Sequence, residues 1–517
     1  MLSMFAAMMT DDTKSSGVIL RFVFTLKQFV ALKEVLCTPF ALPPKRIIGT
    51  LFSPSGWIND GLINERKRGL QKYLTFLIHD MVLSHHTEFL LFLGAGDLPT
   101  HKSTIWPSLV LPEMTSKELM IAKNSTLLEP ERTLKPVAAS YYPSWASDAI
   151  PPHKIDFSKF DILFFAFVTP NGTAGIDWDS GSQETLKALV SSAHSSGHET
   201  KIVLSMGGWS GSHWYSEAMS SASNRSKLVK TLADTIKSYG LDGIDIDWEY
   251  PNASGAGNPH SSADSANFLS FLKLLRSTIG DSKVISAAVT HTPWLGENGA
   301  PLINVSEYAK YMTYVNIMNY DVFSSSSHPG PNAPLGNLCG SSSQPQANAQ
   351  AALAQWTRAG MPAAKLLLGL PVYGYVSKSK DKELTGSSLP SSILPTGAHP
   401  RLAPNRFRIS EALGDLSALW GQQIPFIQLV QSKVLVKNQD GTYGAANGYT
   451  SAWDNCSDTP YLYNIGRTTV VTFDDTYSIA SKTLFAKKSG MGGCFTWSLD
   501  QDDGLTLHNI MLHNLGR

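Results

Sequence analysis

The chain has 517 residues, of which 43% are hydrophobic and 16% are charged. This length exceeds one small domain and is enough for a complete enzyme core. Lys plus Arg number 42 and Asp plus Glu also number 42, so the formal net charge is zero. Because phosphate binding requires a basic surplus, this balance argues against nucleic acid as a partner and against a polybasic membrane anchor.

The cysteines and the apolar runs exclude other classes of site. Cys37, Cys339, Cys456 and Cys494 form no C-x-x-C pair, which argues against a zinc site and against a thioredoxin-type redox site. One or two disulfide bridges are compatible with this count, and the sequence does not predict their pairing. The chain has no run of 18 apolar residues, so we expect no membrane span.

Residues 1–134 differ in pattern from the rest of the chain and show no sustained period of 2 or 3.6. They are either a regulatory or targeting extension, or poorly ordered sequence from an erroneous gene start, and we favour the second interpretation. The first residues lack the basic start and long apolar stretch of a secretory signal. Sequons of the type N-x-[ST] support secretion only weakly, and they occur at Asn124, Asn171, Asn224, Asn252, Asn304 and Asn455.

From about Lys135, short apolar runs rich in β-formers alternate with helical patterns. Parallel strands need helical crossovers, so this alternation predicts an α/β fold, a closed (β/α)8 barrel that spans 135–517. The predicted helices are Gln183–Ser195, Ser226–Tyr239, Ala263–Ile279, Ala347–Ala359 and Tyr477–Lys488. The predicted strands are Val137–Tyr142, Ile162–Val168, Lys201–Gly207, Leu241–Trp248, Lys283–Thr290, Thr313–Tyr320, Lys365–Pro371 and Gly492–Ser498.

The last two predicted strands are separated by about 120 residues, from Pro371 to Gly492, which one helix cannot fill. We interpret roughly Val376–Arg467 as an insertion that forms a small α+β lobe. The alternative is a structureless loop, which would be unusual at this length in a compact domain.

The most informative segment runs from Leu241 to Pro251 and reads L-D-G-I-D-I-D-W-E-Y-P. Because side chains alternate along a strand, Asp245, Asp247 and Glu249 share one face. Like charges this close cannot all ionise, so at least one pKa should rise, as a general acid requires. The interleaved apolar residues argue against an exposed acidic strand. The absence of a distal Glu argues against a calcium loop.

This segment resembles the active-site strand of glycoside hydrolase family 18, the chitinases. The family pattern D-x-x-D-x-D-x-E is matched by Asp242 together with the three acids above. The resemblance extends over about Lys135–Gly504, and residues 1–134 have no counterpart in it. Further segments similar to family motifs are Ser205–Gly208, Met318–Asp321, Gly369–Gly374 and Gly493–Trp497.

The resemblance implies hydrolysis of β-1,4 links in chitin or chito-oligosaccharides by a retaining, substrate-assisted mechanism without metal or organic cofactor. Glu249 would protonate the glycosidic oxygen and later activate water. Asp247 would accept a hydrogen bond from the substrate acetamido N–H, and Asp245 would share a proton with it. Tyr320 would hold the acetamido carbonyl oxygen.

Other residues are candidates for sugar contacts. Asp321 would lie near the acetamido group, and the Trp497 ring would form the floor of the cleft. Met318 and Tyr320 alternate onto one face, although plain core packing explains Met318 equally well. Gly208 permits close backbone approach or a tight turn. Aromatic residues in the acid segment or after strand ends are weaker candidates: Tyr250, Tyr141, Trp209, Trp214 and Trp294. His291 is expected to be structural.

Two other functions fit parts of this pattern. The first is a chitin-binding lectin on the same fold, which the presence of all three acids disfavours. The second is an endo-β-N-acetylglucosaminidase acting on N-glycans, and the pair Tyr320-Asp321 favours a chitinase over it. We expect a secreted protein, since chitin lies outside the cytosol, and a monomer.

Overall fold

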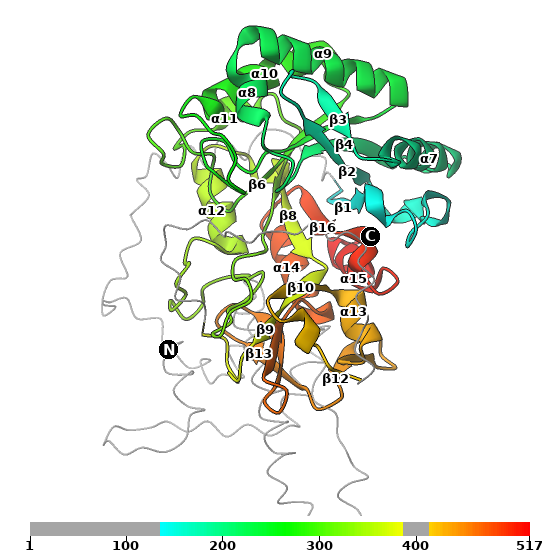
Figure 1. Ribbon diagram of the computed structural model, residues 1–517, viewed down its shortest axis with the longest axis vertical. Helices are drawn as coiled ribbons and strands as arrows, with labels where there is room; N and C mark the ends of the chain where they lie inside the picture. The colour runs from blue at the N-terminus through cyan, green and yellow to red at the C-terminus, as the bar shows by residue number, and fades with distance from the viewer. Residues whose placement is uncertain (1–134, 386–412) are drawn as a thin grey trace, which may run out of the picture. The chain divides into compact units, whose positions relative to one another are not determined.

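The computed structural model describes residues 135–385 and 413–517 (Figure 1). The expectations for residues 1–134, including Cys37 and Asn124, lie outside the described residues. No helix in the described part of the chain has the length and apolar character needed to cross a membrane.

Parallel strands close into a barrel, which confirms the predicted fold class. Strand β1 pairs in parallel with both β2 and β16, and these two pairings close the sheet. A short antiparallel strand, β3 (Ile176–Trp178), extends the end of β2 and was not predicted. The barrel strands are β1 (Val137–Pro143), β2 (Ile162–Pro170), β4 (Lys201–Gly207), β5 (Gly243–Asp247), β6 (Val284–Val289), β7 (Tyr314–Ile317), β8 (Leu366–Pro371) and β16 (Gly493–Trp497).

The five predicted helices are present with small shifts at their ends. They are α7 (Ser182–Ser195), α9 (Ala222–Tyr239), α10 (Asp264–Ile279), α12 (Ala349–Arg358) and α14 (Thr476–Lys488). Helix α9 shows why the ends lie where they do. The Ser221 side chain accepts a hydrogen bond from the Asn224 backbone, and Gly240 ends the helix in the left-handed conformation. The sequence did not predict α8 (Tyr215–Ser220), α11 (Ser306–Ala309), α13 (Phe426–Gln431) or α15 (Thr506–Leu515).

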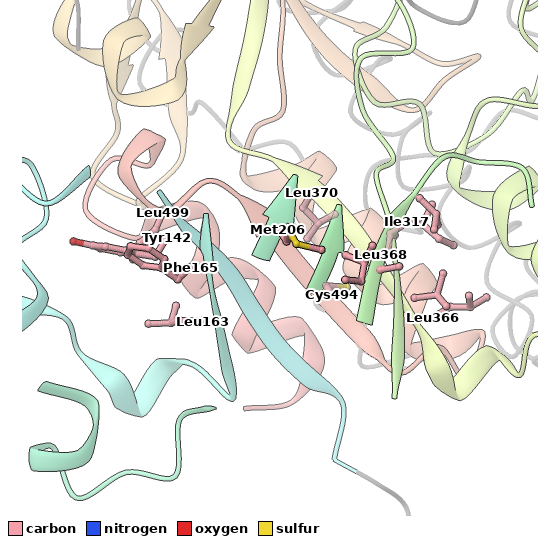
Figure 2. Packing of buried hydrophobic residues seen from close by; sticks show 14 of the residues in the cluster. Tyr142, Leu163, Phe165, Met206, Ile317, Leu366, Leu368, Leu370, Cys494 and Leu499 are labelled. Carbon is pink, nitrogen blue, oxygen red and sulfur yellow. The ribbon is translucent and has the colours of Figure 1, made fainter. Parts of the chain in front are cut away.

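Alternate side chains of the barrel strands divide into two apolar layers. Tyr142 and Phe165 point outward into the layer between strands and helices (Figure 2). Their neighbours Tyr141 and Phe164 point into the barrel interior, where they join a separate cluster. Side chains on the interior face of each strand therefore point to the centre of the barrel, where the acids of β5 lie.

The predicted α+β insertion between the last two barrel strands is present. Its main sheet has the order β10-β9-β15-β14-β13, and α13 packs with it (Figure 1). It runs from Tyr373 to Thr472, a few residues beyond the expected ends on each side, because β9 and β15 pair with each other. Its strands are β9 (Tyr373–Lys378), β10 (Gln422–Pro425), β11 (Leu435–Lys437), β12 (Tyr443–Ala445), β13 (Thr450–Asp454), β14 (Thr459–Asn464) and β15 (Thr469–Thr472).

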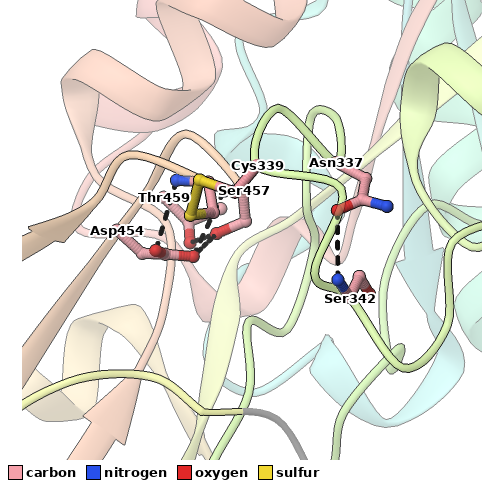
Figure 3. The surroundings of a disulfide bond; sticks show 7 residues. Asn337, Cys339, Ser342, Asp454, Ser457 and Thr459 are labelled. Carbon is pink, nitrogen blue, oxygen red and sulfur yellow. Dashed lines mark hydrogen bonds between the residues drawn. A yellow bond between two sulfur atoms is a disulfide. The ribbon is translucent and has the colours of Figure 1, made fainter. Parts of the chain in front are cut away.

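A disulfide bond between Cys339 and Cys456 joins the β7–α12 loop to the turn between β13 and β14 (Figure 3). Two backbone hydrogen bonds run beside it: Leu335 N donates to Ser457 O, and Leu338 N donates to Cys456 O, each at 2.8 Å. The disulfide thus fastens a barrel loop to the insertion. Cys494 is a buried free thiol.

We expect the double variant Cys339→Ala/Cys456→Ala to unfold more easily than the parent. The bond spans 117 residues of sequence. Closing a loop of that size restricts the unfolded chain, so the free energy of unfolding should fall by about 2 to 4 kcal/mol. Denaturant unfolding of both proteins measures the difference. Cys494→Ala keeps the disulfide and should change stability much less, and equal effects of the two variants would contradict the prediction.

Candidate active site

The three acids of the predicted motif lie together at the carboxyl end of β5. Asp245 and Asp247 belong to the strand, and Glu249 follows two residues after its end. The exposed fractions are 0% for Asp245, 4% for Asp247 and 6% for Glu249. Ile244 and Ile246 pack in the outward layer. The alternation expected from the sequence therefore places the acids on the interior face.

Asp245 is held by side chains from four other strands. Ser205 Oγ and Tyr141 Oη donate to its Oδ2 at 2.7 and 2.9 Å. Ser286 Oγ and Asn316 Nδ2 donate to its Oδ1 at 2.7 and 3.3 Å. Ser205 and Ser286 are the register partners of Asp245 on β4 and β6, so strand pairing brings them to the carboxylate.

Tyr141 requires a correction. It was expected to line a sugar subsite, but its side chain is 1% exposed and its hydroxyl donates to Asp245. Its hydroxyl therefore holds a carboxylate of the acid series. Sequence reasoning did not select Ser286 or Asn316. Each is a polar residue inside an otherwise largely apolar predicted strand, and this feature of the sequence could have identified both.

Asp247 carries an unusual oxygen. Its Oδ1 is buried, and no group within residues 135–385 and 413–517 donates a hydrogen bond to it. Burial, followed by the charges of Glu249 and Asp245, raises the pKa of Asp247 well above its ordinary value. Burial also raises the pKa of Asp245, although the hydrogen bonds of Ser286, Ser205 and Tyr141 partly oppose this effect. The shift at Asp247 agrees with the expectation that three close acids cannot all ionise, whereas the shift at Asp245 comes from burial.

The backbone around Glu249 is fixed by two polar side chains that sequence reasoning missed. Glu249 N donates to Ser212 Oγ at 3.0 Å, and Asn258 Nδ2 donates to Glu249 O at 3.1 Å. The single hydrogen of Ser212 Oγ is shared between two carbonyl oxygens, Gly208 O at 2.9 Å and Asp247 O at 3.2 Å. One hydroxyl thus ties the backbone of both acids to the loop after β4.

The two glycines after Met206 allow this close approach. A Cβ on Gly207, at φ +112°, would lie 2.1 Å from Asp247 O, which no side chain tolerates. Gly208 N donates to the same carbonyl oxygen at 2.8 Å. The close approach predicted for Gly208 is therefore observed toward the backbone of the acid strand.

Met318 and Tyr320 follow the end of β7, which stops at Ile317, earlier than predicted. Both belong to the interior cluster, as their alternation suggested. Tyr320 fits because Gly369 has no side chain: a Cβ there would lie 2.9 Å from Tyr320 Cε1. Burial, followed by the charge of Asp247, raises the pKa of Tyr320, so its hydroxyl stays protonated.

Trp497 is half-buried at the end of β16 and joins an aromatic cluster. Its ring stacks on Phe167 with centroids 5.7 Å apart and meets the edge of Tyr141 at 5.3 Å. Sequence reasoning did not select Phe167. The packing holds the Trp497 ring in one orientation while part of it stays accessible.

Asp321 is brought to the site by donors from the insertion. Tyr373 Oη and Tyr375 Oη each donate to Asp321 Oδ1 at 2.6 Å. The backbone of Asp321 has φ +58°, and its N donates to Asn332 Oδ1 at 2.9 Å. The sequence placed Tyr373 in a family-like motif but predicted neither hydroxyl contact.

The remaining aromatic candidates differ in their surroundings. Tyr250 hydrogen-bonds to Glu249, and its pKa is raised first by burial and then by that charge. Trp209 is half-buried and Trp214 is 43% exposed, both in the loop after β4. Trp294 requires a correction. It lines a small hollow beside Tyr250, but it is 7% exposed and the centroid of its ring lies 4.9 Å from that of Trp356. It therefore serves mainly the core.

His291 is structural, as expected. Its Nε2 lies 3.2 Å from Asn319 Oδ1, and burial lowers its pKa to about 4. A neutral imidazole that hydrogen-bonds to an amide side chain is typical of a buried, structural histidine. In the described part of the chain, no group of three or more His, Cys, Asp or Glu side chains is arranged to hold a metal ion.

A model of glycosyl hydrolase family 18 matches residues 137–502. The chain belongs to this family. The match covers the barrel and the insertion, so family 18 membership applies to the part that contains the acids. A second model, of the PX domain, matches residues 25–95, outside the described residues.

Relatives agree with this assignment. The crystal structure of a chitinase from Rhizomucor miehei matches with a TM-score of 0.61 and 31% identity, over 73% of this chain and 99% of that chain. A protein of Moniliophthora roreri named "chitinase-like effector" is 33% identical over 80% of this chain and 99% of its own length. Chitinase A1 of Niallia circulans is 26% identical over 66% of this chain and 46% of its own length. The family is therefore clear, and some of these relatives are named chitinases while another is named a chitinase-like effector.

Proposed function

We propose that this family 18 protein is a chitinase that hydrolyses β-1,4 links between N-acetylglucosamine units with retention of configuration. The intact acid series of β5 carries the proposal, above all the buried Asp247 Oδ1 for which the described residues supply no donor. A substrate acetamido N–H would be such a donor. Burying a carboxylate without this partner is costly, which supports a role in binding over a role in stability.

The reaction would proceed in two steps without a covalent bond to the protein. Glu249 donates its proton to the glycosidic oxygen while the substrate's acetamido carbonyl oxygen attacks the anomeric carbon. The leaving sugar departs and a cyclic oxazolinium ion forms. Asp247 accepts the acetamido N–H hydrogen bond and balances the positive charge, and Asp245 shares a proton with it. The Glu249 carboxylate then takes a proton from water while the water oxygen bonds to the anomeric carbon, and the bond between that carbon and the acetamido oxygen breaks.

Three further residues would position the substrate. Tyr320 Oη would donate to the acetamido carbonyl oxygen, since its raised pKa keeps the hydroxyl protonated. The accessible part of the Trp497 ring would stack under the sugar bound next to the acids. Asp321 would bind sugar or acetamido groups beside Tyr320.

The proposal is tested with the full chain on fluorogenic glycosides of chitobiose and chitotriose. Release of the fluorophore supports a chitinase. A high-mannose glycoprotein, assayed beside them, tests for endo-β-N-acetylglucosaminidase action. Cleavage of the glycoprotein alone would overturn the proposal.

A chitin-binding protein without hydrolysis is the second candidate, because two relatives at 33% identity bear the name "chitinase-like effector". Binding to chitin beads, measured beside the hydrolysis assay, separates the candidates. A chain that binds chitin and releases no product is a lectin. The complete acid series favours the enzyme.

We also propose that the protein is secreted, as a chitin-degrading enzyme requires. The disulfide Cys339–Cys456 supports this proposal, because such bonds persist in oxidising compartments.

Asn304 is an exposed sequon that is suited to carry a glycan after secretion. It is exposed, its Oδ1 accepts from Ser306 Oγ at 2.7 Å, and the adjacent Ile303 is 92% exposed. By contrast, the Asn252 amide donates to Gly296 O at 2.6 Å in a packed loop. We expect mass spectrometry of chain secreted from yeast to find N-glycan at Asn304. Asn304→Gln should remove that mass and Asn252→Gln should not. An unmodified Asn304 contradicts the prediction.

A further inference from the structure

Asp321 lies in the barrel, yet three side chains of the insertion reach one of its oxygens. Tyr373 Oη and Tyr375 Oη donate to Asp321 Oδ1, each at 2.6 Å, and Gln423 Nε2 points to the same atom from 3.4 Å. The contacts span 52, 54 and 102 residues of sequence respectively. Three donors around one oxygen restrict the rotation of the carboxylate.

Tyr375 and Gln423 act as a pair within the insertion sheet. They are opposite each other in the antiparallel register of β9 and β10. Gln423 Nε2 also donates to Tyr375 Oη at 2.9 Å. That bond occupies an acceptor position of the phenol oxygen, so the phenol hydrogen is directed to Asp321. Burial and the charge of Asp321 raise the pKa of Tyr375, which keeps this hydroxyl a donor.

The backbone of Asp321 is fixed from the same side. Asn332 Oδ1 accepts from Asp321 N at 2.9 Å, and Asn332 Nδ2 donates to Tyr373 O at 3.2 Å. The loop that carries Asn332 is fastened to the insertion by the disulfide at Cys339. The backbone and the side chain of Asp321 are thus both held in place by contacts that lead to the insertion.

We propose that Tyr375 and Gln423 are positioning residues through which the insertion sheet orients Asp321 for oligosaccharide binding. The inference rests on the proposed function, because it assumes that Asp321 contacts the substrate. The insertion then contributes to the binding site indirectly, because it orients the Asp321 carboxylate, which belongs to the barrel.

The test compares single and double variants of the full chain. Tyr375→Phe removes one hydroxyl and Gln423→Leu removes the amide. Isothermal titration with chitotetraose, with every variant and its parent carrying Glu249→Gln so that the ligand is not hydrolysed, should show affinity about tenfold weaker for Tyr375→Phe and a smaller loss for Gln423→Leu, as expected for a lost hydrogen bond to a charged group. If the chain hydrolyses the fluorogenic chitobioside, KM should rise more than kcat falls.

The double variant Asp321→Ala/Tyr375→Phe decides whether the effect passes through Asp321. We expect it to bind no more weakly than Asp321→Ala alone, since alanine leaves no carboxylate for Tyr375 to orient. Additive losses would overturn the positioning role. If Tyr375 has only a structural role, the losses of the two substitutions should add. If Tyr375 positions Asp321, they should not add, so the double variant separates a structural role from a positioning role.

Tyr461→Phe is the matched control. The Tyr461 hydroxyl lies in the same sheet and donates to Lys382 O at 2.7 Å, away from Asp321. It should lose stability without losing affinity. A parent that does not bind chitotetraose refutes the proposed function and the inference with it. A parent that binds, with unchanged affinity in Tyr375→Phe and Gln423→Leu, refutes the inference alone.

Discussion

Glu249→Gln should abolish most hydrolysis and leave chito-oligosaccharide binding nearly intact. Glutamine has almost the same shape as glutamic acid but has no acidic proton to transfer to the leaving oxygen. General acid–base catalysis by one positioned group typically contributes about 10²- to 10⁴-fold, so kcat should fall within or beyond that range. Initial rates on fluorogenic chitobiose and chitotriose glycosides measure the effect.

The matched control for this variant is Glu184→Gln. Glu184 is an exposed residue of α7, and its substitution should leave both rate and affinity unchanged. Wild-type activity in Glu249→Gln would show that another group supplies the proton. A folded parent that binds oligosaccharide but is itself inactive would instead identify the protein as a lectin.

Asp247→Asn should reduce hydrolysis and yet stabilise the protein at neutral pH. The variant loses the charge that balances the oxazolinium ion, and removal of one electrostatic contact of this kind costs about 10²- to 10³-fold in kcat. Stability should change in the opposite direction because burial, followed by the charges of Glu249 and Asp245, penalises the ionised form of Asp247. Function and stability therefore conflict at this position.

The raised pKa of Asp247 determines how the Tm difference between Asp247→Asn and the parent changes with pH. The pKa of Asp247 is raised in the folded state above its unfolded value of about 4. Above pH 4, and up to the raised pKa, the folded state binds more protons than the unfolded state, so the parent loses stability as pH increases. Asparagine does not titrate. The Tm advantage of Asp247→Asn should therefore be small near pH 3.5 and increase toward pH 7.

Thermal unfolding across this pH range tests the prediction. Asp242→Asn is the control on the same segment: the Asp242 carboxylate accepts from Ile202 N at 2.9 Å, so its substitution should lower Tm. A Tm advantage of Asp247→Asn that is largest at acidic pH, or absent at every pH, would contradict the interpretation of the acid series.

Local sequence determined the barrel and the acid series. Eight apolar runs separated by helical patterns predicted each barrel strand, because a buried parallel strand needs little beyond its own β-forming residues and a helical crossover. Alternation along one strand was enough to place Asp245, Asp247 and Glu249 on one face. The end of β7 was predicted less accurately, since strand ends depend on partners elsewhere in the chain.

Only the tertiary structure decided which groups surround the acids. The bond from Tyr141 to Asp245 spans 104 residues, and the contact of Gln423 with Asp321 spans 102. Such contacts depend on strand register and on the path of loops, which no local period encodes. The same reason applies to the pairing of Cys339 with Cys456, which the sequence left open. The sequence thus determined which acids share one face of a strand, and tertiary packing decided how their carboxylates are held.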